Sequence, residues 1–223
     1  MRKTFHRQIN KITKDVLSMS SLTQNTMRNA VNALVDIDCD LAQEVIDRDP
    51  EIDDYEISIE EKCMVLQAEY QPVAIDLRYL HSISNIIIHL ERIGDLSVNI
   101  ARVTKRLAKL KKPYLDKNIK ELLIEMQNLV NSELSKASAA FKNRDLKLAT
   151  KLGKIDDDVD DIQKVIIKKL YSSAPSSQEN IKIITNILLT SRYLERIGDH
   201  AVSIGERVQY FLTGDYKVFH WDS

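Results

Sequence analysis

The chain contains few of the residues that interrupt helices. Five glycines and four prolines occur in 223 residues, and both residue types favour turns over helix interiors. Leu, Ile, Lys, Glu and Ala are abundant instead, and apolar residues recur at spacings of three and four residues, as they do on one face of a helix. With 43% hydrophobic residues the chain can bury a substantial core, so the sequence predicts an all-α protein.

Other features that the chain lacks exclude several classes of protein. The two cysteines, Cys39 and Cys63, lie far apart and form no CxxC motif, so neither a disulfide framework nor a thiolate zinc site is indicated. No apolar run approaches the ~18 residues of a membrane-spanning helix. Lys plus Arg (32) nearly balance Asp plus Glu (33), which argues against nucleic-acid binding. We expect a cytoplasmic protein that is at most peripheral to a membrane.

Prolines and turn-rich segments divide the chain into two halves of three predicted helices each. The predicted helices cover residues 4–35, 39–70, 76–110, 117–142, 146–172 and 178–212. The predicted domains are a first three-helix repeat over 1–112, a second over 113–215 and a C-terminal tail over 216–223, which we expect to pack back on the bundle. Pro50 lies inside the second predicted helix, where it would either stand in a first helical turn or kink a continuous helix.

The two halves of the chain are copies of each other. The segment LERIGD occurs at residues 90–95 and again at 194–199. A second register aligns DCDLAQEVIDRD at 38–49 with DLKLATKLGKID at 145–156. This duplication predicts two tandem three-helix bundles related by approximate internal symmetry.

Carboxylates gather at two places in the first half. Glu91 and Asp95 are four residues apart, so they lie on one face of a helix and repel each other. The preceding helix adds a row of acids spaced four, three and four apart, namely Asp49, Asp53, Glu56 and Glu60. Carboxylates beside apolar surface are costly unless something compensates their charge, and a multivalent cation would do so. We therefore predict a carboxylate-bridged metal site.

The second half repeats these acids in a thinner row. The copies are Glu195, Asp199, Asp156 and Asp160. Gln163 and Ile167 stand where the last two acids of the row would fall, so a second metal site would be smaller, weaker or absent. Oxygen ligands of this kind suit Mg, Mn, Ca or Fe(III).

Each motif also contains a glycine and an arginine. Gly94 and Gly198 stand inside a predicted helix, where the missing Cβ permits close approach by a neighbouring helix or by a metal cluster. Arg92 and Arg196 follow the glutamates directly. Because residues one apart on a helix do not face each other, we expect these arginines to serve a different helix.

Two histidines flank the motifs at unmatched positions. His89 precedes the first motif and His200 follows the second. We interpret both as structural histidines or as neighbours of a metal ligand.

The duplicated LERIGD, the NIA at residues 99–101 and QPVAIDLRYL at 71–80 resemble the PhoU family. The resemblance implies two symmetric three-helix bundles whose acidic motifs, in some members, hold multinuclear clusters of iron or another metal. Zn, Mn, Mg, Ca and Ni remain candidates beside iron. The motif residues would be Glu91, Asp95, Glu195 and Asp199, with Asp49, Asp53, Asp156 and Asp160 contributed by the middle helices.

The same resemblance implies a regulator of phosphate uptake and of phosphate-starvation signalling. Its partners would be the ATPase of the Pst phosphate transporter and a phosphate sensor histidine kinase, and a homodimer is expected. The chain contains no phosphate-binding glycine loop and no nucleophile with a general base, so we do not expect an enzyme.

Three other functions compete with this prediction. A ferritin-like metal oxidase or storage bundle would need Glu-x-x-His repeats, which do not occur. A helical scaffold with purely structural acids would bind no metal. An accessory protein of a different phosphate transporter also fits the sequence.

Overall fold

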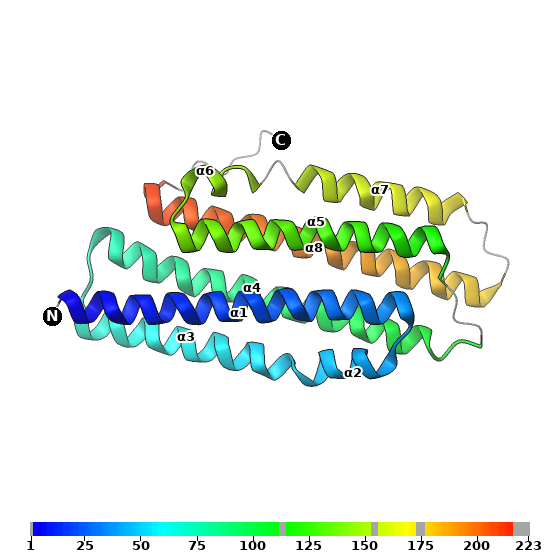
Figure 1. Ribbon diagram of the computed structural model, residues 1–223, viewed down its shortest axis with the longest axis horizontal. Coiled ribbons are helices and arrows are strands. Elements are labelled where there is room, and N and C mark those ends of the chain that lie inside the picture. Colours follow the sequence, from blue (N-terminus) through cyan, green and yellow to red (C-terminus); the bar gives the residue numbers. More distant parts are fainter. Residues whose placement is uncertain (1, 112–114, 153–155, 173–176, 216–223) are drawn as a thin grey trace.

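The computed structural model describes residues 2–111, 115–152, 156–172 and 177–215 (Figure 1). These residues form α-helices and no strand, as the composition predicts. The helices are α1 (Arg2–Asp36), α2 (Cys39–Asp47), α3 (Asp49–Tyr70), α4 (Ala74–Leu107), α5 (Lys117–Asn143), α6 (Leu146–Ala149), α7 (Asp156–Ser172) and α8 (Gln178–Thr213). The predicted tail, 216–223, lies outside the described residues.

The internal repeat appears in matching helix caps. Asp38 accepts hydrogen bonds from the backbone N–H groups of Asp40 and Leu41, both at 3.0 Å, and so starts α2. Its copy, Asp145, accepts one from Leu148 N–H at 3.0 Å and starts α6. A carboxylate at this position satisfies N–H groups that have no partner within the helix. Aligned aspartates therefore cap equivalent helices in both halves.

The second predicted helix, 39–70, is in fact two helices. Pro50 stands in the first turn of α3, where its missing N–H costs nothing. The chain turns at Arg48, whose N–H bonds the carbonyls of Glu44 and Ile46. The fifth predicted helix, 146–172, is likewise divided into α6 and α7, with residues 153–155 outside the description. Pro50 thus starts a new helix and does not kink a continuous one.

Four long helices, α1, α4, α5 and α8, form the centre of the molecule (Figure 1). The α2–α3 segment packs against α1 and α4, and the α6–α7 segment packs against α5 and α8. Each half is therefore a three-helix bundle, as the duplication predicts, although its middle helix is divided in two. The two bundles meet where α4 packs on α8 and α1 packs on α5.

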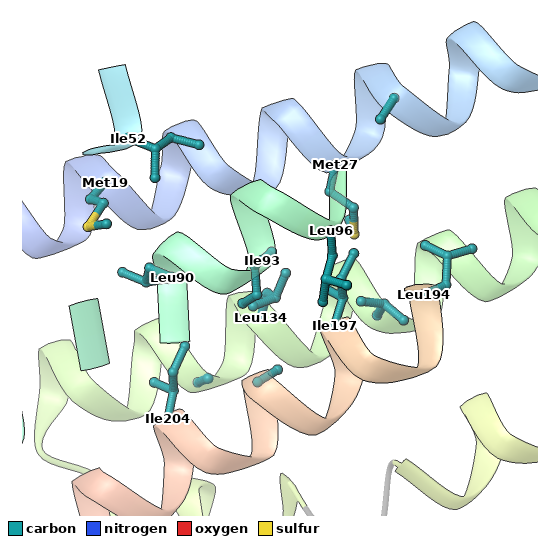
Figure 2. Close-up of a cluster of buried hydrophobic side chains, with 14 of the residues drawn as sticks. Met19, Met27, Ile52, Leu90, Ile93, Leu96, Leu134, Leu194, Ile197 and Ile204 are labelled. Atoms are coloured by element: carbon teal, nitrogen blue, oxygen red, sulfur yellow. The ribbon is translucent and has the colours of Figure 1, made fainter. Parts of the chain in front are cut away.

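One apolar core runs through both bundles. Figure 2 shows Leu90 and Ile93 of α4 beside Ile197 and Ile204 of α8, with Leu134 of α5 close by. All five side chains are at most 3% exposed. Because the two repeats bury their apolar faces against each other, neither bundle has a separate interior.

A shared core predicts that both bundles unfold together. Ile93→Ala should cost about 2–5 kcal/mol, the usual loss for a fully buried aliphatic side chain, and Ile197→Ala should cost a similar amount. Urea unfolding of both variants should remain a single transition. Ile88→Ala is the control, because Ile88 lies on the same helix but is 46% exposed. Two separate transitions in either core variant would contradict the shared core.

Candidate metal centre

The acids of the first half lie along the contact between α3 and α4. Asp49 lies at the first turn of α3, and its pKa is raised by partial burial and by the charges of Asp53 and Asp95. Glu56, further along α3, also has a raised pKa, chiefly because of burial, and Asp95 contributes. Charges on α4 therefore act on carboxyl groups of α3, as expected for facing rows.

Glu91 is the most perturbed of these carboxyl groups. Its side chain is only 18% exposed. Burial, followed by the charge of the neighbouring Asp95, raises its pKa from 4.5 to about 7. Glu56 and Asp53 act in the same direction from α3. The site thus holds several carboxyl groups that cannot all ionise without repulsion.

Arg92 compensates part of this negative charge on its own helix, where the prediction expected it to serve a different helix, and it acts on α3 as well. Its Nε lies 3.4 Å from Glu91 Oε2, and its Nη1 lies 3.3 Å from Asp95 Oδ2. The guanidinium also lowers the pKa of Glu56. The rule that neighbouring residues on a helix do not face each other describes the directions of their Cβ atoms. The long arginine side chain can still fold back over its own helix. The Arg92 side chain is 58% exposed, so it contacts these acids from the solvent side.

The second half places fewer acids together. Asp160 of α7 raises the pKa of both Glu195 and Asp199, in each case after the larger effect of burial. Asp156 begins α7, and its side chain lies outside the description. Gln163, at the position of Glu56, donates from Nε2 to the Ser191 carbonyl at 3.4 Å. Gln163 therefore makes a hydrogen bond at a position where a glutamate would add a further negative charge.

Arg196 repeats the behaviour of Arg92. It lowers the pKa of Glu195 and of Asp199, the two acids of its own motif. Arg196 thus acts electrostatically on acids of its own helix, and its role toward another helix stays a prediction. Each LERIGD segment carries its own counter-charge, so the acids are partly neutralised without a cation.

Gly94 allows α3 to approach α4 closely. A Cβ at this position would lie 2.9 Å from Ile52 Cδ1 and 3.4 Å from Ile52 Cγ2. Asp49 Oδ1 lies 3.8 Å from the same point. The space left by the glycine is thus filled by a side chain of the neighbouring helix, and that packing also brings Asp49 to the edge of the site.

The described residues do not present a ready-made metal site. In this part of the chain, no three His, Cys, Asp or Glu side chains stand close enough to hold one ion. Carboxylate oxygens are nevertheless suitable donors for hard cations. Glu91, Asp95 and the α3 acids are the side chains that would hold such a cation. The metal itself therefore stays a prediction.

The two histidines meet each other, which the sequence did not indicate. His89 Nδ1 and His200 Nδ1 lie 3.2 Å apart across the contact of α4 with α8. Burial lowers the pKa of His89 to about 4 and also lowers that of His200. Because the pair joins the two repeats, no spacing within either repeat could have revealed it.

Glu91→Gln tests whether repulsion among the carboxyl groups destabilises the metal-free fold. Since folding raises the pKa of Glu91 from 4.5 to about 7, the folded chain binds more protons than the unfolded chain in this interval. Its stability should therefore fall as the pH rises through it. The glutamine variant lacks this fall. Its stability relative to the native chain, from urea unfolding with a chelator, should be higher at about pH 8 than at about pH 5.

Glu51→Gln is the control for this measurement. Arg48 lowers the pKa of Glu51 through a side-chain hydrogen bond, so the relative stability of this variant should not rise over the same interval. If Glu91→Gln differed from the native chain by the same amount at both pH values, Glu91 would not be a destabilised acid.

Comparison with known proteins connects this arrangement to a family. The model of the PhoU domain matches residues 16–104 and 123–208, one match in each half. The PhoU homolog 1 of Methanothermobacter thermautotrophicus is 34% identical over 212 residues, which cover 95% of both chains. The homolog of Pseudomonas aeruginosa is 34% identical over 94% of this chain and 86% of its own. Both are named phosphate-specific transport system accessory proteins.

Solved structures agree with the sequence comparison. The crystal structure of PhoU from Pseudomonas aeruginosa matches with a TM-score of 0.87 at 33% identity, covering 95% of this chain and all of that one. The phosphate transport system regulatory protein PhoU from Streptococcus pneumoniae matches with a TM-score of 0.86 at 28% identity, over 95% and 98% of the two chains. The resemblance found in the sequence motifs is confirmed, and the chain belongs to the PhoU family.

Proposed function

We propose that this protein is a metal-binding regulator of phosphate uptake that represses phosphate-starvation genes when phosphate is abundant. Its relatives are named as accessory proteins of the phosphate-specific transport system, and the similarity extends over both repeats. Names of this kind describe a protein that acts on a transporter, which supports a binding role over catalysis.

The partners in this proposal are the transporter's ATPase and a phosphate sensor histidine kinase. Both would be reached from the cytoplasm, and every helix in the described ranges is too short or too polar to cross a bilayer. A homodimer is part of the same proposal. The alternative is an accessory role at a different phosphate transporter. A PhoU-family protein would act there too, and only the ATPase that it binds would differ.

The observation that carries the metal part of the proposal is the gathering of half-buried carboxyl groups with raised pKa values in both halves. The first group of ligands would be Glu91, Asp95, Asp49, Asp53 and Glu56. The second would be Glu195, Asp199, Asp160 and Asp156. A bound cation would supply positive charge at the centre of each group and hold the acidic helices together. Iron, Mn, Mg, Ca, Zn and Ni all remain candidates, since oxygen donors alone do not select one.

Metal content tests this assignment residue by residue. Elemental analysis of the purified native protein should detect bound metal, and Glu91→Ala/Asp95→Ala should lose only the share held by the first half. Glu195→Ala/Asp199→Ala should lose only the share of the second half, because the two sites use separate acids. Glu121→Ala/Glu125→Ala is the matched control. It removes an exposed acid pair at the same spacing from α5 and should leave the metal content unchanged.

Metal that is absent from the native protein, or equally present in all three variants, would refute the metal part of the proposal. It would favour a helical scaffold whose acids are structural and are compensated by Arg92 and Arg196.

The regulatory part needs a test in the native host. Deletion of the gene should derepress phosphate-starvation genes in phosphate-rich medium, because the repressing signal would be lost. Transcript measurements should show repression restored by the native chain and by Glu121→Ala/Glu125→Ala. Restoration by Glu91→Ala/Asp95→Ala should be weaker. Unchanged expression after deletion would exclude the regulatory role.

A further inference from the structure

A groove between α1 and α3 takes no part in the proposed metal sites. Its volume is about 720 Å³. The two helices run side by side in opposite directions at the outer edge of the first repeat (Figure 1). Phe5, near the start of α1, lies against Tyr70 at the end of α3, with 5.3 Å between the ring centroids, and Asp15 pairs with Lys62 at 2.8 Å. We call this feature the α1–α3 groove.

The groove has an apolar floor and exposed apolar side chains beside it. Ile12 and Leu66 line its floor and are at most 4% exposed. Val65 also lines the groove but is 52% exposed, and Ile57 and Met64 continue this apolar surface along α3 at 59% and 56%. The opposite side of α3 buries apolar side chains against α1 and α4. A helix that is apolar on both sides is typically covered on both.

The second repeat shows that the bundle itself does not need this exposed apolar surface. Extending the register that aligns residues 38–49 with 145–156 places Ile57 on Lys164 and Val65 on Ser172. Both positions of α7 are exposed, as both positions of α3 are. Two equivalent surfaces thus differ in polarity at matched residues. Exposed apolar surface that only α3 has at these positions indicates a contact that only α3 makes.

The two rims of the groove carry opposite charges. Lys11 and Lys14 are exposed on the α1 rim, and Glu61 and Glu69 are exposed on the α3 rim. The remaining acid and base of the lining pair with each other across the groove. A surface that is basic on one side and acidic on the other is complementary to a second copy of itself, provided that unlike rims meet.

We propose that the α1–α3 groove is the interface between two copies of this chain, with α3 of each copy lying in the groove of the other. A two-fold axis parallel to the helices brings the basic rim of each copy against the acidic rim of the other. An axis across the helices would bring like rims together, which repel. The exposed apolar side of each α3 leaves water for the apolar floor of the opposite groove. This inference rests on the homodimer of the proposed function and assigns its surface.

The pairing of α1 with α3 also predicts which charges meet. Because Asp15 pairs with Lys62 within one copy, Lys14 and Glu61 lie at nearly the same height along the groove. A two-fold axis parallel to the helices keeps this height, so Lys14 of each copy stands opposite Glu61 of the other. Exposed ion pairs add little affinity, whereas like charges in their place are unfavourable. The charges therefore select the orientation of the two copies.

Replacement of an exposed apolar side chain tests the interface. Sedimentation velocity of the native chain should show a dimer that dissociates on dilution. Met64→Glu should weaken dimerisation at least about tenfold, because a charge would have to be buried among apolar side chains. Tyr171→Glu is the matched control. It changes the exposed residue at the equivalent position of α7 and should dimerise as the native chain does.

Charge reversal tests the orientation of the two copies. Lys14→Glu and Glu61→Lys should each weaken dimerisation by about three- to tenfold, since each places like charges opposite each other. The double variant Lys14→Glu/Glu61→Lys should dimerise more tightly than either single variant, because unlike charges then face each other again. A double variant that dimerises more weakly than both would contradict the axis parallel to the helices.

Two results would overturn the proposal, and they differ in what they say about the homodimer. If the native chain is a dimer and Met64→Glu dimerises equally well, the two copies meet at another surface. If the native chain is a monomer at every concentration, the homodimer of the proposed function is excluded as well, and the groove is left to a different protein. Neither result touches the metal content or the gene repression, which have their own tests. Circular dichroism should show each variant folded, because the changed side chains are exposed.

Discussion

The apolar contact between α4 and α8 is the interaction on which the rest of the structure depends. Each helix carries one LERIGD motif, and the leucine and isoleucine of each motif are fully buried. Leu90 and Ile93 of one repeat and Leu194 and Ile197 of the other lie in the same cluster (Figure 2). Burial of this apolar surface joins the bundles and also determines where the polar residues of the motifs stand. The acids, arginines and histidines are therefore placed by the core beneath them.

Acidic and basic side chains of the two motifs surround that core. Acidic groups lie where α3 packs on α4 and where α7 packs on α8, and Arg92 contacts two acids of the first group. Burial and, after it, repulsion among the carboxyl groups raise their pKa values, and Arg92 relieves part of the repulsion. Like charges held together without full compensation are the observation on which the proposed cation site rests.

Much of the architecture followed from residue patterns. The duplicated segments predicted two bundles, and Asp38 and Asp145 indeed cap equivalent helices. The position of Pro50 left two outcomes open, and local spacing could not choose between them, because it does not say whether the helix before Pro50 ends or continues. The pairing of Arg92 with its own motif was missed, since it depends on the rotamer of a long side chain and not on the spacing of Cβ atoms.

The sequence by itself determined the all-helical fold, the internal repeat, the family and the set of acids beside apolar positions. These follow from periodicity and motif, which are local properties of the chain. Only the tertiary structure decided that Ile52 fills the gap at Gly94 and that His89 meets His200. Contacts of this kind join residues from different helices or different repeats. They depend on how the helices rotate and slide to bury their apolar faces, and no single segment encodes that choice.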